Sequence, residues 1–301
     1  MIIEKREWNG WPNCWRVSNG TVELVVTQDI GPRVMRYAFV GGQNLFKEFT
    51  EQLGQGGESN WCIRGGHRLW KGPEDRHATY ALDNAAIDIQ TTANTITATQ
   101  PVEPETGLQK QIQLQLAETG TEVIVKHTIW NRGLLPVEIA AWTPTVMAQS
   151  GLGVTGFPPR GTHPEDLEPT NPLIMWAFTD LTDPRWKFTK KYLTLQQDPA
   201  SHSPQKLGHW NQHTFGAYFL NGDVFLKEYF PANGMRHPEF GASFEIFTNQ
   251  DFLELETMGP FTKLAKDEAL THVEYWSLHK ATLGSVTDQA LDAALLPLLR
   301  K

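Results

Sequence analysis

Hydrophobic and polar residues alternate along most of the chain, and a period of two is typical of β-strands that bury one face. The alternation begins at Thr21 and continues to about residue 278, with an interruption over residues 150–212. Asn221-Gly222, between two alternating runs, is the strongest hairpin signal. The clearest predicted strands cover residues 22–26, 33–39, 95–99, 110–116, 123–130, 137–142, 213–220, 223–230, 242–248, 251–257 and 270–278.

These runs predict an all-β protein with about fourteen antiparallel strands. Strands and helices do not alternate, and no repeat of 20–50 residues is visible, so a parallel sheet is excluded and a propeller is disfavoured. We therefore predict a large antiparallel β-sandwich that forms a single domain over residues 1–301.

The two ends of the chain depart from the alternation. Residues 1–20 are rich in tryptophan and turn residues and are expected to lie across the surface as an N-terminal segment. Residues 287–299 predict one short C-terminal helix, because Leu291, Leu295 and Leu298 fall on one helical face. Pro297 is expected to end or kink this helix.

The interruption at residues 150–212 is rich in proline, glycine, histidine and aspartate. Within it, only residues 173–178 and 192–197 resemble strands. Loops of this length in compact domains tend to be binding walls or lids. Apolar and aromatic residues recur throughout, so we expect a functional surface rather than an interdomain linker.

Composition narrows the possible partners. The chain has a net charge of −8, with 40% hydrophobic and 20% charged residues, which indicates a globular protein. Lysine and arginine form no stripe, so we expect no nucleic-acid partner, and no apolar run is long enough to span a membrane. Eleven tryptophans and fifteen phenylalanines suit either a large core or the stacking of sugar rings on indole faces.

Two cysteines, Cys14 and Cys62, fit either a disulfide or two thiols in a reducing compartment. The N-terminus lacks the apolar stretch of a signal peptide. The prediction is a soluble cytoplasmic protein, present as a monomer or a weak homodimer.

The densest chemistry lies in residues 61–74, WCIRGGHRLWKGPE. Arg64 and Arg68 offer forked donors, while Gly65-Gly66 allows positive φ or close approach of the backbone to a ligand. Trp70 offers a flat apolar face with one N–H. These residues indicate one wall of a binding site, or alternatively a structural loop held by arginine–carboxylate pairs.

A late strand carries two acidic residues, Glu254 and Glu256, on one face. Their separation along the strand is about 7 Å. In a partly dry groove one of them would have a raised pKa and could act as a general base. On a solvent-facing strand they would have no such role.

Ten histidines are present, but none has the spacing of a metal-site signature, so we expect neither a metal nor a cofactor. His67 lies next to Arg68, and His209 precedes Trp210. An isolated histidine is more often structural than catalytic.

The chain resembles the galactose mutarotase-like superfamily, the aldose 1-epimerase β-supersandwich, over residues 21–281. Residues 31–34 and 44–46 resemble its opening strands, residues 63–66 are similar to the Arg-Gly-Gly segment of hexose-6-phosphate mutarotases, and residues 253–257 resemble the strand that carries the catalytic glutamate. The resemblance implies ring opening of a sugar, in which a glutamate takes the anomeric proton and a histidine protonates the ring oxygen.

One position departs from this family pattern. The strand that should carry the histidine reads Ala140-Ala141-Trp142-Thr143-Pro144. Either another histidine replaces it, with His67 and His209 as candidates, or the sugar site remains without the chemistry.

The resulting hypothesis is a carbohydrate-binding protein, with an aldose 1-epimerase as the enzymatic form. Its proposed catalytic residues are Glu254, Glu256 and His67, and its proposed sugar-binding residues are Arg64, Arg68, Trp70, His209 and Trp210. The alternatives are a non-catalytic sugar-binding or regulatory domain and a polysaccharide lyase or hydrolase.

Overall fold

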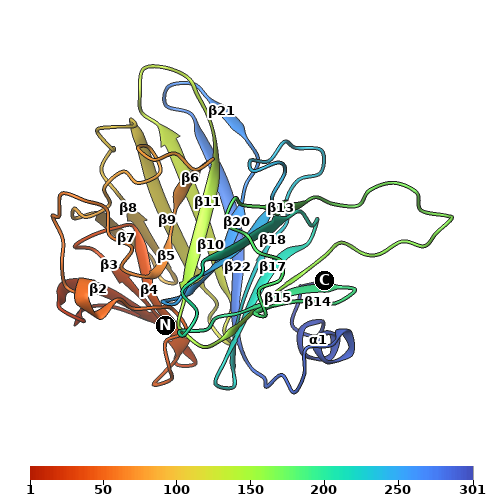
Figure 1. Cartoon of the computed structure of the whole chain (residues 1–301). Helices are drawn as coiled ribbons and strands as arrows, with labels where there is room; N and C mark the ends of the chain where they lie inside the picture. Colours follow the sequence, from red (N-terminus) through yellow and green to blue (C-terminus); the bar gives the residue numbers. More distant parts are fainter. Residues whose placement is uncertain (301) are drawn as a thin grey trace.

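The computed structural model describes residues 1–300 and contains two large antiparallel sheets packed face to face (Figure 1). The first sheet follows the order β1 (Ile2–Trp8), β2 (Trp11–Ser18), β3 (Val22–Thr27), β4 (Arg33–Phe39), β5 (Gly66–Arg68), β11 (Val137–Met147), β20 (Leu253–Met258), β19 (Phe244–Thr248), β16 (Gln205–His209) and β13 (Leu173–Met175). Two short strands, β6 (Trp70–Gly72) and β21 (Thr262–Leu264), also pair with β11.

The second sheet follows the order β14 (Trp186–Phe188), β15 (Tyr192–Gln196), β12 (Leu152–Gly156), β17 (Thr214–Leu220), β18 (Asp223–Tyr229), β22 (Ala269–Lys280), β10 (Val123–Asn131), β9 (Leu108–Leu116), β8 (Thr95–Thr99) and β7 (Asp88–Thr91). The all-β sandwich predicted from the alternation is thus confirmed. The described residues form 22 strands rather than about fourteen, because the sequence pattern does not reveal three-residue strands such as β5 and β14.

The main core fills the space between the two sheets. It contains aromatic side chains from both, including Tyr37 and Phe46 from the first sheet's side and Phe225 and Trp276 from the second. These rings meet edge to face, with Phe46 and Phe225 centroids 5.3 Å apart and Phe46 and Trp276 centroids 5.8 Å apart. This geometry favours aromatic pairs beyond the area that they bury.

The N-terminal segment differs from its prediction. Residues 1–20 contain β1 and β2, which extend the first sheet at its edge. The exposed side chains of β1 agree with a surface position, whereas Trp11, Cys14 and Val17 of β2 are buried. Cys14 and Cys62 are both free thiols.

The predicted C-terminal helix is α1 (Asp288–Leu295), preceded by Thr287, whose side chain caps it by accepting a hydrogen bond from the Ala290 N–H. Leu291 and Leu295 are fully buried against the outer face of β12, β17 and β18. Each contributes about 1.5 to 3 kcal/mol through burial. The only other described helix is the 3₁₀ turn Thr50–Gln52, and neither is long and apolar enough to span a membrane.

The region 150–212 contains five strands, β12 to β16, which is more order than the sequence indicates. Its longest stretch without a strand, residues 157–172, projects from the sandwich (Figure 1). β13 and β16 extend the first sheet beside β19, so this region lies on the same sheet as β20 with only β19 between β16 and β20.

Candidate functional site

A pocket of about 280 Å³ lies on the face of the first sheet that points away from the second sheet. Leu253 and Leu255 of β20 enter the core, so the alternating Glu254 faces the pocket. The pocket is lined by Trp61, Ile63, Arg68, Trp70, Glu74, Tyr80, Trp142, Trp176, Phe178, Lys206, Phe247, Phe252 and Glu254.

Two buried ion-pair groups form the floor of this pocket. Arg68 Nη2 donates to Glu254 Oε1 at 2.9 Å. Beside this pair, Lys206 Nζ lies 3.0 Å from Glu256 Oε2 and 2.7 Å from Glu245 Oε2. All five residues are at most 8% exposed, so solvent screens their charges weakly.

Aromatic rings surround both cations. The Arg68 guanidinium lies 3.9 Å from the Trp70 ring centroid and 5.3 Å from that of Trp61. The Lys206 ammonium lies 4.8 Å from the Trp142 centroid and 4.7 Å from that of Trp176. These cation–π contacts hold each cation in place and leave the pocket walls largely apolar.

Trp142 connects a wall of the pocket to its floor. Its Nε1–H donates to Glu256 Oε2 at 2.7 Å, and its ring packs edge-on against Trp70. The residue that stands near the family's acid position is therefore a pocket residue, although an indole is not a proton donor at neutral pH.

Burial shifts the pKa values of the ionisable side chains at the floor of the pocket. It raises the pKa values of Glu245 and Glu254, and the neighbouring cations offset this only in part. Burial alone would lower the pKa of Lys206, but the carboxylates of Glu245 and Glu256 more than offset it and raise that pKa. Lys206 thus holds its proton firmly, whereas Glu254 can exchange one closer to neutral pH.

Several buried polar atoms at the pocket have no hydrogen-bond partner. They include Arg68 Nε and Nη1, Trp61 Nε1 and Glu256 Oε1. Unsatisfied buried polar atoms are costly, and their concentration in one place is typical of a ligand site.

The structure brings together only some of the residues predicted for the site. Arg68, Trp70 and Glu254 line the pocket, and Glu256 lies directly beneath it, as the shared face of the two glutamates predicts. His209 is fully buried and contacts Thr155 Oγ1, while Trp210 is half-buried after β16 and does not line the pocket.

His67 belongs to a different site. It precedes Arg68 on β5 and points to the opposite face, between the two sheets. There its Nε2 lies 2.8 Å from His127 Nε2, and its Nδ1 lies 2.9 Å from Thr145 Oγ1. His67 is 0% exposed, so it cannot reach a ligand beside Glu254.

We call the group around His67 the inter-sheet polar cluster. At its centre, Lys227 Nζ lies 2.8 Å from Glu274 Oε1, and all of its members are almost fully buried. The cluster consists of His67, His127, His272, Lys227, Glu274, Thr143, Thr145 and Thr257.

Hydrogen bonding fixes the tautomers at the centre of this cluster. His127 Nδ1 lies 3.1 Å from the His272 carbonyl, which can only accept, so His127 Nδ1 carries the proton. His127 Nε2 then accepts from His67 Nε2–H, and His67 Nδ1 accepts from the Thr145 hydroxyl. This pattern is the one expected of two neutral rings, and burial lowers the pKa values of both histidines and so favours the neutral forms.

One group in the cluster has donors that could ligate a metal. The ligand atoms of His67, His127 and Glu274 lie within 4.8 Å of one another. The Lys227 ammonium already contacts Glu274 at 2.8 Å and would repel a cation. The arrangement therefore favours a salt-bridged structural cluster, and we propose no metal.

Arg64 is a structural residue of the loop before β5. It is fully buried, has a φ of 51°, and forms an ion pair with Glu58. It does not line the pocket. This is the arginine–carboxylate pairing that the sequence left as the alternative for residues 61–74.

Gly65-Gly66 allows the chain to pass between two other backbone segments. Gly65 has a φ of +91°, and a Cβ there would lie 1.9 Å from the Lys47 carbonyl oxygen. At Gly66, with a φ of +68°, a Cβ would lie 2.4 Å from the Val34 oxygen. The close approach is to protein backbone rather than to a ligand.

Gly65→Ala is expected to lower the free energy of unfolding by about 2 to 3 kcal/mol, because backbone strain and the clash with Lys47 act together. Gly57→Ala is the matched control, since Gly57 also has a positive φ of +78° but no atom within 4 Å of its Cβ position. Urea unfolding of both variants measures the difference. Equal losses would show that the clash at Gly65 relaxes without cost.

Comparison with solved structures shows what this architecture resembles. A candidate aldose 1-epimerase from Klebsiella pneumoniae aligns over 92% of this chain and 83% of its own, with a TM-score of 0.59 and 10% identity. A galactose mutarotase-like protein from Lactobacillus casei aligns over 89% of this chain and 100% of its own, with a TM-score of 0.57 and 11% identity. The chain has the galactose mutarotase-like fold.

The mutarotase-like fold also occurs within larger proteins. A GH36 α-galactosidase from Geobacillus stearothermophilus aligns over 94% of this chain but only 42% of its own, with a TM-score of 0.52 and 10% identity. No protein-family model matches the chain, and no curated protein matches it by sequence. The likeness thus confirms the fold that the sequence predicted.

Several residues at the pocket are not predicted by the sequence patterns, and the sandwich fold brings them there. Lys206 and Trp176 come from the region 150–212, and Glu245 lies directly opposite Glu256 in the β19–β20 pair. The alternation Gln205-Lys206-Leu207 is consistent with a strand that carries Lys206, but it is too short to predict one. Glu245 required the strand register, which the sequence does not give.

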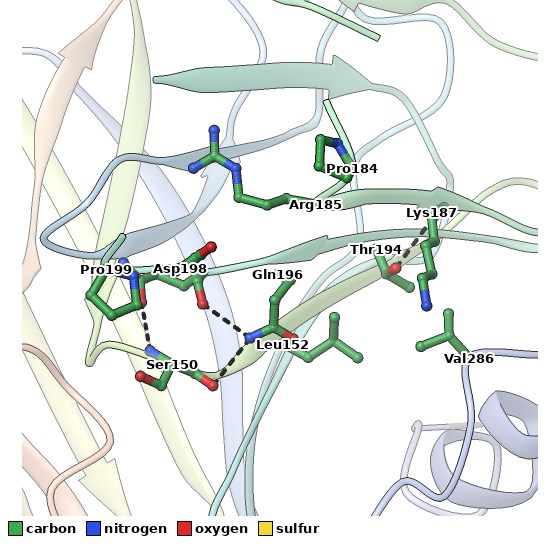
Figure 2. Close-up of a pocket in the computed structure, with 11 residues that line it drawn as sticks. Ser150, Leu152, Pro184, Arg185, Lys187, Thr194, Gln196, Asp198, Pro199 and Val286 are labelled. Atoms are coloured by element: carbon green, nitrogen blue, oxygen red, sulfur yellow. Dashed lines mark hydrogen bonds between the residues drawn. The ribbon is translucent and has the colours of Figure 1, made fainter. Parts of the chain in front are cut away.

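Three larger cavities lie elsewhere on the molecule, and the smallest of them, of about 380 Å³, is lined mainly by residues 219–222 and 281–286. One of about 530 Å³ lies between β12, β14, β15 and the segment before α1, where Gln196 Nε2 donates to the backbone oxygen of Ser150 at 3.1 Å (Figure 2). Another, of about 780 Å³, lies between residues 156–162, β15 and α1, and there the Tyr192 hydroxyl donates to Asp292. None of the three combines paired buried charges with aromatic walls, so we prefer the smaller pocket.

Proposed function

We propose that this protein binds a monosaccharide or sugar derivative in the pocket above Arg68, Glu254 and Lys206. The observation that carries the proposal is the buried Arg68–Glu254 pair, 2.9 Å long, at the floor of an aromatic-walled pocket. Sugar hydroxyls both donate and accept hydrogen bonds, and such bonds are strongest to ionised groups. Trp70 and Trp142 supply flat faces for the C–H side of a sugar ring.

The pocket volume of about 280 Å³ lies just below the usual range for small-molecule sites and suits one sugar ring rather than a long chain. This size disfavours the polysaccharide lyase or hydrolase alternative. The cytoplasmic location, the monomeric or weakly dimeric state, and the absence of nucleic-acid or membrane partners stay predictions.

Aldose 1-epimerase activity is the second candidate, and the raised pKa of Glu254 favours it. In ring opening, a base takes the anomeric hydroxyl proton, the bond from C1 to the ring oxygen breaks, and an acid protonates that oxygen. Glu254 suits the base, because its pKa is shifted toward the working pH. The lining contains no histidine, and Lys206 is the proposed acid, although its raised pKa makes it a slow one.

Glu254→Gln is expected to weaken sugar binding about 10-fold or more, because a charge-assisted hydrogen bond is lost and Arg68 is left without its carboxylate. Calorimetric titration with a panel of aldoses measures the affinity, and NMR exchange between α and β anomers measures epimerisation. The matched control is Glu118→Gln, an exposed hairpin residue.

The two readouts separate the candidates. If the wild type binds a sugar but does not accelerate the exchange between its anomers, the protein is a sugar-binding protein and not an epimerase. Equal affinity of Glu254→Gln and the wild type would place the binding site elsewhere.

A further inference from the structure

The proposed sugar pocket has an excess of acidic groups. Its lining contains Glu74 and Glu254, with Glu245 and Glu256 in ion-pair contact with Lys206 beneath it. The cations there are Arg68 and Lys206, so four acidic side chains meet two basic ones. A ligand that carries a carboxylate or phosphate would add to this excess.

Both cations have carboxylate partners, while Arg68 Nε and Nη1 stay without a hydrogen bond and can donate to a sugar hydroxyl. Arg68 is paired with Glu254 at 2.9 Å, and Lys206 is held by two carboxylates at 2.7 and 3.0 Å. The raised pKa values of Glu245 and Glu254 have burial as their main cause, and repulsion from Glu256 adds to both. Because the pKa of Glu245 is raised to about 8, this side chain is largely protonated at pH 7 and the floor is close to neutral, so the carboxylate of the lining without a cationic partner is Glu74.

The pocket mouth has a carboxylate free to receive that charge. The Tyr80 hydroxyl donates to Glu74 Oε1 at 2.6 Å and fixes the orientation of the carboxylate. Glu74 itself is exposed and has no ion-pair partner among the described residues. Its second oxygen is thus open to a donor from a ligand.

Aromatic faces at the same place favour a cation. The Tyr80 ring packs 5.4 Å from Trp61 and 5.0 Å from Trp70, centroid to centroid. An ammonium group near Tyr80 and Glu74 would combine a cation–π contact with a charge-assisted hydrogen bond.

We propose that the pocket selects a sugar that bears a protonated amine, of the hexosamine class, and that Glu74 binds the amine. This inference rests on the proposed sugar-binding function and specifies its ligand class. Neutral sugars bind more weakly in the same pocket, and sugar acids bind weakest.

The test is a calorimetric titration of the full chain at pH 7 with D-glucosamine, D-glucose, N-acetyl-D-glucosamine and D-glucuronate. We expect D-glucosamine to bind about 3- to 5-fold more tightly than D-glucose, as exposed charge and cation–π contacts allow. Glucuronate is expected to bind weakest. The preference for the amine should shrink at 0.5 M salt, because salt screens the exposed Glu74.

Glu74→Gln is expected to remove most of the preference for D-glucosamine, measured as the ratio of the D-glucosamine and D-glucose affinities of the same variant. Tyr80→Phe, which removes the hydroxyl that orients Glu74, is expected to reduce the preference in part. Glu51→Gln, an exposed acid in the 3₁₀ turn, is the control.

The outcomes distinguish this inference from the proposed function. Equal affinities for D-glucose and D-glucosamine, or tightest binding of glucuronate, overturn the amine preference while sugar binding stands. Retention of the preference in Glu74→Gln overturns the role of Glu74. If none of the four sugars nor any aldose of the panel binds, the proposed function fails and the inference fails with it.

Discussion

Replacing Lys227 by methionine is expected to lower the free energy of unfolding by about 3 to 5 kcal/mol, because it leaves the Glu274 carboxylate buried without its partner. Lys227 Nζ lies 2.8 Å from Glu274 Oε1 and also donates to the Thr143 carbonyl and the Thr145 hydroxyl. Both charged side chains are 0% exposed, so water cannot replace the lost contacts. The loss would be a large part of the stability of a typical domain.

Urea unfolding at pH 7 measures this loss, with Lys126→Met on the exposed face of β10 as the matched control. The double variant Lys227→Met/Glu274→Gln is expected to recover much of the loss, since no uncompensated charge remains. If Lys227→Met unfolds at the same urea concentration as the wild type, the ion pair does not stabilise the sandwich.

Acidification from pH 7 to pH 5 is expected to destabilise the protein by about 3 kcal/mol. Burial lowers the pKa of His127 to about 4, that of His209 to about 4 and that of His272 to about 3. The unfolded chain binds these protons near pH 6.5, whereas the folded chain cannot. Each of these histidines therefore costs about 2 kcal/mol at pH 5, with the loss beginning as the pH falls below 6.5.

Two carboxyl groups oppose this trend. The raised pKa values of Glu245 and Glu254 favour folding as the pH falls, which makes the net loss smaller than the histidines alone would give. Urea midpoints at pH 5, 6 and 7 measure the net slope. His209→Gln should flatten the slope and exposed His77→Gln should not. Equal slopes for His209→Gln and the wild type would contradict the neutral state of this buried histidine.

The sequence alternation predicted most of the fold because it records which side of each strand is buried. It placed Glu254 and Glu256 on one face, and both lie at the pocket. The same rule separates His67 from Arg68, which are adjacent on β5 and face opposite sides of the sheet. A strand of three residues between glycines and a tryptophan has no alternation to identify it, so the sequence alone does not separate the two side chains.

The rest of the site depends on strand pairing between distant segments. Lys206 reaches Glu256 because β16 pairs with β19 and β19 pairs with β20. Neither pairing has a local signal, since each is determined by how the two sheets fill their common core. The burial of Glu254 also cannot be predicted from the sequence, because the side chains that cover it, Trp61, Trp70 and Phe252, come from other segments and from the turn before β20.

Along β20, residues that face the pocket alternate with residues that face the core. This alternation also determines which mutations the protein can tolerate during evolution. Deletion of one residue there would turn the leucines outward and carry the glutamates into the hydrophobic core. The strand can vary in residue identity, but its length is fixed. Residues 157–172 project from the sandwich, and a change in their length costs little loop entropy. Divergence among descendants of this chain should therefore appear as substitutions in the strands and as insertions in that loop.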